Sequence, residues 1–132
     1  MRSTSPTCRP VALVIDDEPS MRELLSIVLE EEGYVVLTAK DGRDCLERLD
    51  ECPPDIVILD LHMPNMKGDE LVGHIRRRQA TRDVPIVVIS GSPSLSDEHP
   101  VYKQVQAFLA KPFDLDQLVR LVNELSLEAQ VI

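Results

Sequence analysis

The chain has 132 residues, 43% of them apolar, which is the size and composition of one compact domain with an ordinary core. Its formal net charge of −9 argues against a surface built to bind nucleic-acid phosphates or an anionic membrane. Arg76, Arg77 and Arg78 are a local exception, which we interpret as the solvated end of a helix.

Membrane and export signals are missing from the sequence. No apolar stretch approaches the length of a transmembrane helix, and the polar leader at 1–10 lacks the apolar core of a signal peptide. Cys8, Cys45 and Cys52 are an odd number without metal-ligand spacing, so neither a disulfide framework nor a zinc site is indicated. We therefore expect a cytoplasmic protein with reduced thiols.

Five short apolar runs alternate with helical patterns. The runs lie at 11–15, 34–39, 56–59, 86–89 and 107–110. The first, third and fourth are apolar almost throughout, as strands are when both faces of a sheet are covered. Helical patterns lie between and after them, one opened by Pro19 and closed by Gly33, the others at 42–51, 69–78 and 115–125. This alternation predicts an α/β fold with a doubly wound, five-stranded parallel sheet and helices on both faces.

The connection at 91–106 differs from the others. Pro93 and Pro100 would break any helix that spanned it, so we expect at most a short helix near 101–106 and a fourth helix that is short or irregular. The predicted domain covers 11–126, and 127–132 form a C-terminal tail. Little chain follows the last helix, so we expect either a stand-alone domain or an excised piece of a longer protein.

Polar residues occur where the predicted strands end. Asp16 and Asp17 follow the first strand, Asp60 the third, Ser90 the fourth and Lys111 the fifth. Each alone has an ordinary explanation as a turn, helix-entry or surface residue. Together they converge on the carboxyl edge of the sheet, where open α/β sheets bind their ligands.

The residue types at this edge point to a chemistry. Asp16, Asp17 and Asp60 offer hard oxygen ligands, and a site with few carboxylates suits Mg²⁺ better than Ca²⁺, which prefers a fuller cage. A divalent cation would offset the repulsion among the acids. Lys111 adds a second positive contact and Ser90 a hydrogen bond, a combination suited to phosphoryl transfer.

Four motifs carry a family resemblance. IDDEPSMRELL, DIVILDLHMPNMKGDEL, PIVVISG and AFLAKPFDLDQL resemble, in this order, the receiver domain of two-component response regulators. The similarity runs from about Val11 to Leu125, with spacings that also fit the family, although the last is slightly short. The resemblance implies a flavodoxin-like (βα)5 fold.

The resemblance also implies roles for the site residues. Asp60 is the expected phospho-acceptor, which takes a phosphoryl group from a sensor histidine kinase or phosphotransfer protein. Asp17, Asp60 and the backbone carbonyl of His62 are expected to ligate Mg²⁺ directly, and Asp16 through a water molecule. Lys111 is expected to pair with the phosphoryl oxygens.

Three further positions follow from the same resemblance. Ser90 and Phe108 are the expected switch residues, although Phe108 lacks the hydroxyl that a tyrosine would bring. Pro112 is expected to follow a cis peptide bond. His62 and Ser92 lie two residues after Asp60 and Ser90, and our hypothesis is that they tune the lifetime of the aspartyl phosphate.

The resemblance predicts protein partners. They are the kinase or phosphotransfer protein, a downstream protein or output domain in a longer chain, and a second copy bound through the surface around 101–110 and the last helix. Direct nucleic-acid and membrane contacts are not expected.

Two alternatives differ from a signalling receiver. One is an interaction module of the same fold that is not phosphorylated, against which the set of Asp60, Lys111 and Ser90 argues. The other is a Mg²⁺-dependent phosphohydrolase, which the sequence does not favour because no DxD pattern follows the third strand. We expect no enzyme in the usual sense, only stoichiometric self-phosphorylation and slow autodephosphorylation.

Overall fold

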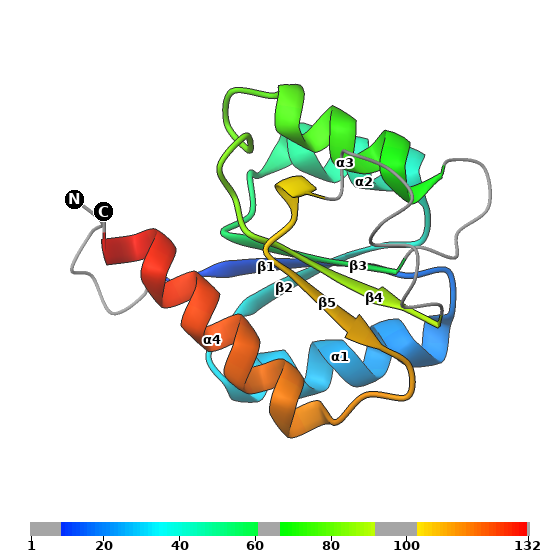
Figure 1. The fold of residues 1–132 in the computed structure, drawn as a ribbon, viewed down its shortest axis with the longest axis vertical. Coiled ribbons are helices and arrows are strands. Elements are labelled where there is room, and N and C mark those ends of the chain that lie inside the picture. The colour runs from blue at the N-terminus through cyan, green and yellow to red at the C-terminus, as the bar shows by residue number, and fades with distance from the viewer. Residues whose placement is uncertain (1–8, 61–66, 92–102, 132) are drawn as a thin grey trace.

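The computed structural model describes residues 9–60, 67–91 and 103–131, with side chains up to residue 126. Its strands form one sheet between two layers of helices (Figure 1). The strands are β1 (Val11–Ile15), β2 (Val35–Ala39), β3 (Ile56–Asp60), β4 (Ile86–Ser90) and β5 (Ala107–Ala110). The helices are α1 (Pro19–Glu31), α2 (Gly42–Glu51), α3 (Gly68–Arg77) and α4 (Leu115–Val131).

The strands run in parallel in the order β2-β1-β3-β4-β5, which confirms the predicted fold. The chain winds outward from β1 in one direction and then, through β3, in the other. This places β3 at the centre and leaves β2 and β5 at the two edges. The carboxyl ends of β3, β4 and β5 lie at the same level of the sheet to within one residue, because Asp60 pairs with Ile89 and Ser90 pairs with Ala110.

Alternating side chains along the strands build a separate core on each face of the sheet. On the face that α2 and α3 cover, Leu13, Val57 and Leu59 pack with Cys45, Leu71 and Ile75. On the face that α1 and α4 cover, Val14, Ile56 and Ile58 pack with Leu25, Leu29 and Leu118. Both faces of the central strands are therefore buried, which accounts for their continuous apolar sequence.

Local signals set both ends of α1 and the start of α2. Pro19 begins α1, where its missing N–H costs nothing, and Gly33 follows the helix with a φ of 99°, in the left-handed region that favours glycine. The Asp41 carboxylate caps α2 by accepting a hydrogen bond of 2.8 Å from the amide of Asp44. These signals fix where α1 begins and ends and where α2 begins.

The element boundaries differ from the predicted ones by a residue in several places. β2 begins at Val35, and β3 and β4 each extend by one residue, so that Asp60 and Ser90 are the last residues of their strands. α4 continues to Val131, past the predicted domain boundary at 126. The domain boundaries themselves stay a prediction.

The connection between β4 and β5 is described only at Gly91 and from Lys103 onward. A short turn at Lys103 and Gln104 leads into β5, and no α-helix occurs in this described part. Pro93 and Pro100 lie outside the described residues. Within the described chain, no helix is long and apolar enough to cross a membrane.

Candidate functional site at the carboxyl edge of the sheet

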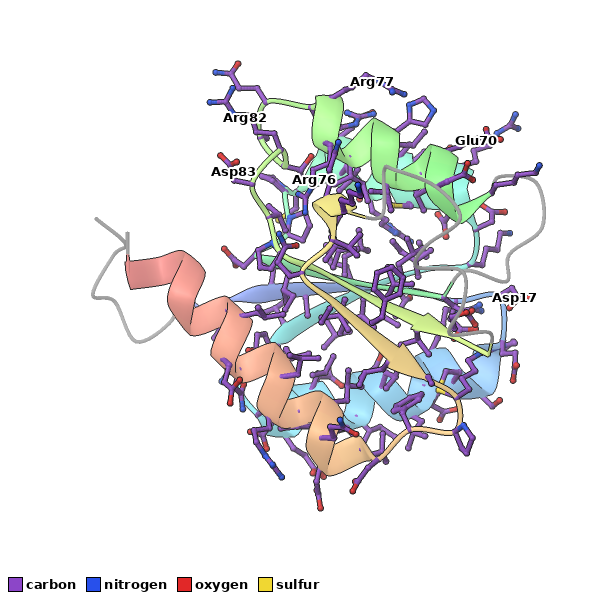
Figure 2. The ribbon with its side chains drawn as sticks, in the orientation of Figure 1. Asp17, Glu70, Arg76, Arg77, Arg82 and Asp83 are labelled. Atoms are coloured by element: carbon purple, nitrogen blue, oxygen red, sulfur yellow. The ribbon has the colours of Figure 1, made fainter. Side chains whose placement is uncertain are left out.

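The backbone brings the predicted site residues to one edge. Asp16 directly follows β1, and its amide donates a hydrogen bond of 3.0 Å to the carbonyl of Ala39 at the end of β2. Lys111 directly follows β5, and its amide donates a hydrogen bond of 2.8 Å to the carbonyl of Ser90. The ladder pattern thus continues one residue past these strands. Figure 2 shows Asp17 at this edge, in the loop that leads from β1 into α1.

Three carboxylates form the acidic part of the site. Oxygen atoms of Asp16, Asp17 and Asp60 lie within 4.8 Å of one another. Asp16 and Asp60 are each only 2% exposed, whereas Asp17 faces solvent. Burial raises the pKa of Asp16 to about 6, an amide hydrogen bond from Glu18 opposes the rise, and the negative charge of Asp60 adds to it. The Glu18 amide lies 2.9 Å from Asp16 Oδ1.

Lys111 supplies the positive charge in this group. Its Nζ donates a hydrogen bond of 2.8 Å to Asp60 Oδ2. Burial by itself lowers the pKa of Lys111, but the hydrogen bond and the charge of Asp60 outweigh burial and raise it. One ammonium does not balance three carboxylates. The donor set therefore fits a hard divalent cation, which takes carboxylate oxygens and keeps some of its waters.

The predicted switch residues lie on the two neighbouring strands. Ser90 ends β4 and is 2% exposed. Phe108 pairs with Val88 across the β4–β5 ladder and packs, half-buried, against the core under α2 and α3. The peptide bond between Lys111 and Pro112 is cis. The structure thus brings Ser90 and Lys111 to the edge that holds Asp60, with Phe108 on β5 three residues before Lys111.

Two predicted residues lie outside the described part of the chain. His62 was expected to supply a backbone carbonyl to the cation, and His62 and Ser92 were expected to tune the lifetime of the phosphoryl group. These roles stay predictions.

Arg22 was not among the predicted site residues, yet it also contacts the site. Its Nη1 donates a hydrogen bond of 2.7 Å to the backbone carbonyl of Asp16. Arg22 is in the first turns of α1, so its guanidinium reaches back over the loop that carries the acid pair. A basic residue one turn into the helix that follows two adjacent aspartates is the only sequence signal for this contact.

Comparison with known proteins identifies the family. The profile of the response regulator receiver domain matches residues 12–123. This chain therefore belongs to the receiver domain family of two-component response regulators, as its fold and edge residues indicated.

Curated relatives show the family in several contexts. The transcriptional regulatory protein KdpE of Mycobacterium tuberculosis is 36% identical over 110 residues, covering 83% of this chain and 47% of KdpE. The sensor histidine kinase TmoS of Ectopseudomonas mendocina is 36% identical over 89% of this chain and 12% of its own length. An uncharacterised 14.6 kDa protein of Leptolyngbya boryana is 32% identical and matches 85% of this chain and 86% of its own. The chain thus spans about half of KdpE and most of the small protein.

Solved structures agree with this assignment. The chemotaxis response regulator CheY4 of Vibrio cholerae superposes with a TM-score of 0.81 at 30% identity, over 89% of this chain and 99% of CheY4. The response regulator TrrA of Thermotoga maritima, solved in complex with Mg²⁺-BeF, gives a TM-score of 0.78 at 34% identity, over 88% of this chain and 98% of TrrA. Both likenesses extend over nearly the whole domain.

Proposed function

We propose that this receiver domain accepts a phosphoryl group on Asp60 from a sensor histidine kinase or a phosphotransfer protein. One observation carries the proposal: a buried carboxylate at the end of the central strand, 2.8 Å from the Lys111 ammonium and within 4.8 Å of two further acids. A carboxylate held in this way is oriented for attack on an electrophile that the surrounding charges attract.

The proposed chemistry is a direct transfer. An Asp60 carboxylate oxygen attacks phosphorus, a P–O bond forms, and the P–N bond of a phosphohistidine donor breaks with its electron pair going to the imidazole nitrogen. Lys111 neutralises charge on the phosphoryl oxygens during the transfer. The product is an aspartyl phosphate, formed once per chain, so we infer stoichiometric modification rather than enzymatic turnover.

Asp16, Asp17 and Asp60 are the residues that we infer hold Mg²⁺, with the backbone carbonyl of His62 as a further proposed ligand. Bound Mg²⁺ supplies positive charge for the oxygens of the transferred group. The geometry of the three carboxylates supports this inference, as does the Mg²⁺-BeF complex of the relative TrrA. The excess negative charge at the site is the physical reason for the affinity.

The signal is proposed to leave through β5. Ser90 would bond the phosphoryl group and Phe108 would follow it inward, which changes the surface around β5 and α4. Downstream proteins, an output domain in a longer chain, or a second copy are the proposed partners for this surface. KdpE and TmoS support the second of these, because their receiver-like segments belong to longer chains.

Labelling with radioactive acetyl phosphate and Mg²⁺ tests the proposal. We expect one acid-stable, base-labile phosphate per chain, which is lost in Asp60→Asn. Asp83→Asn is the matched control, since Asp83 is an exposed carboxylate outside the acidic cluster. An unlabelled wild type would favour the non-phosphorylated interaction module, and sustained release of phosphate over many turnovers would favour the phosphohydrolase.

The tuning hypothesis has its own test. If His62 and Ser92 aid or block the attacking water, His62→Ala and Ser92→Ala change the rate at which labelled protein loses its phosphate. Unchanged dephosphorylation in both variants would refute this role.

A further inference from the structure

The end of α3 that faces β5 carries a guanidinium with an unusual number of partners. Arg76 Nη1 donates to the carbonyls of Val84 at 2.7 Å, Arg82 at 3.1 Å and Thr81 at 3.2 Å. Its Nε and Nη2 both donate to the carbonyl of Gln104, at 3.0 and 2.7 Å. The interpretation of the three arginines as a solvated helix end is therefore wrong for Arg76.

Gln106 extends this network to the sheet. Its Oε1 accepts hydrogen bonds from Arg76 Nη2 at 3.0 Å and from the amide of Ile86 at 2.7 Å. The backbone amide of Gln106 donates a hydrogen bond to the backbone carbonyl of Ile86 at 3.0 Å. Arg76 and Gln106 thus tie together the end of α3, the start of β4 and the segment entering β5, and we call this set of contacts the Arg76 clamp.

Figure 2 shows how differently the side chains of Arg76 and Arg77 lie. Arg76 reaches from α3 toward the turn that precedes β5, whereas the neighbouring Arg77 lies on the outer surface of the helix. Arg77 contacts Nδ1 of His74 at 3.2 Å, within its own helix. Burial lowers the pKa of Arg76 and the charge of Asp83 opposes this, yet a guanidinium keeps its charge at neutral pH. The two arginines carry the same charge in different settings.

β5 is the shortest strand that the structure describes. It has four residues, lies at the edge of the sheet and pairs only with β4. Its carboxyl end leads directly to Lys111, whose Nζ must stay within hydrogen-bond distance of Asp60. A slip of one residue along a strand moves it by about 3.3 Å and turns every side chain to the opposite face, so even a transient slip removes Lys111 from Asp60.

We propose that Arg76 is a positioning residue for the phosphoryl site: the Arg76 clamp fixes the amino end of β5 and thereby holds Lys111 against Asp60 at the other end of the strand. The consequence for phosphorylation rests on the proposed function, whereas the consequence for the position of β5 does not. Arg76 is on the opposite edge of the sheet from the acids and acts only through the strand.

The test compares Arg76→Met with Arg77→Met, which removes the same charge from the adjacent residue. A second pair, Gln106→Leu and Gln106→Glu, removes or keeps the acceptor oxygen that Arg76 and Ile86 share. Two measurements are made on each variant: the initial rate of labelling by acetyl phosphate at saturating Mg²⁺, and amide hydrogen exchange of Lys111 in unlabelled protein. Exchange of β1 and β3 amides reports opening of the whole domain and serves as the reference.

We expect Arg76→Met and Gln106→Leu to speed Lys111 exchange relative to the reference and to slow labelling roughly three- to tenfold, because a small misplacement of a catalytic group is costly. Arg77→Met and Gln106→Glu should stay within about twofold of wild type, since a carboxylate oxygen still accepts both hydrogen bonds. If Arg76→Met does not fold, the Gln106 pair decides the question alone.

Two results would overturn the proposal. One is equal slowing in Arg76→Met and Arg77→Met, which would make the lost positive charge the cause, or equal slowing in Gln106→Leu and Gln106→Glu, which would show that the shared acceptor oxygen does not matter. The other is faster exchange at Ile86 and Gln106 with Lys111 unchanged, which would make the clamp a local structural feature. A wild type that takes no label would refute the proposed function instead, and the exchange comparison would still decide whether the clamp positions β5.

Discussion

Buried charges are balanced differently at the carboxyl ends and at the amino ends of the strands, which we call the carboxyl edge and the amino edge. At the carboxyl edge, three carboxylates share one ammonium, and burial raises the pKa of Asp16 to about 6. At the amino edge, the guanidinium of Arg76 is surrounded by carbonyl oxygens, and the carboxylate of Asp55 accepts a hydrogen bond of 2.7 Å from the amide of Val11. The carboxyl edge keeps an excess of negative charge, whereas the charged groups of the amino edge have hydrogen-bond partners in the backbone.

This difference separates function from stability. Uncompensated carboxylates lower the free energy of unfolding, but they create affinity for a cation and a phosphoryl group. Compensated groups stabilise the fold and have no remaining affinity to offer a ligand. Substitutions at the first edge should therefore change ligand binding most, and those at the second should change stability or strand position.

The largest effect is expected for Asp17→Ala. Removal of the exposed member of the acidic cluster should abolish Mg²⁺ binding and labelling, while the fold keeps its stability or gains some because a repulsive charge is lost. Mg²⁺ titration followed by NMR measures the first effect and urea unfolding the second. Glu18→Ala is the control, because it removes the adjacent carboxylate, which lies outside the cluster. Mg²⁺ binding that survives in Asp17→Ala would contradict the proposed site.

Lys111→Met should slow labelling by about 100-fold, the usual effect of removing one donor that stabilises charge in a transition state. It should also destabilise the protein, since Asp60 is 2% exposed and loses its ammonium partner. Labelling rates and urea unfolding of the same samples measure both effects. Wild-type labelling in this variant would show that the ammonium has no part in the transfer.

Asp16→Asn should stabilise the Mg²⁺-free protein at neutral pH. Because folding raises the pKa of Asp16 from 3.8 to about 6, the folded state binds the proton more tightly, and stability falls as the pH rises through this window. The substitution removes this cost at pH 7 and keeps an oxygen for the Glu18 amide. Urea unfolding with a chelator should show a gain at pH 8 that shrinks toward about pH 5. A gain independent of pH would assign it to another cause.

The smallest effect is expected at the amino edge. Thr81 is buried, and its hydroxyl donates a hydrogen bond of 2.6 Å to the carbonyl of Ile75 near the end of α3. Thr81→Val should lower the free energy of unfolding by about 1 kcal/mol, because the Ile75 carbonyl loses one of two hydrogen bonds and keeps the one from the Arg78 amide, and should leave labelling unchanged. Loss of labelling without loss of stability would contradict the separation of the two edges.

The strand-end residues of the site could be predicted because the carboxyl ends of parallel strands all lie at the same edge of the sheet. The alternation of buried runs and helices gives the sheet, and the sheet brings Asp16, Asp60 and Lys111 to one edge whatever the details of the loops. The one-residue extensions of β3 and β4 were not predicted, since Asp60 and Ser90 are polar and the pattern stops at the last apolar residue.

The role of Arg76 could not be read from the sequence. Three adjacent arginines at the end of a helix give a local signal of solvation, and the carbonyl of Gln104 that Arg76 contacts lies 28 residues away. Backbone carbonyls have no sequence signature, so a contact of this kind becomes visible only when the chain is folded. The same holds for Arg22, whose acceptor is the backbone carbonyl of Asp16.

The strand order also determines when the site is completed as the chain is synthesised. β1, β2 and β3 are neighbours in the sheet and belong to the first 60 residues, so they can pair before the rest of the chain emerges. The three acids then meet before Lys111 has been translated, because Lys111 follows β5, the last strand and an outer one. Docking of β5 onto β4 then brings the Lys111 ammonium to Asp60. We expect a nascent chain that ends before β5 to bind cations at the three acids without competition from Lys111. The site of the finished domain has its full set of charged groups only when β5 has docked.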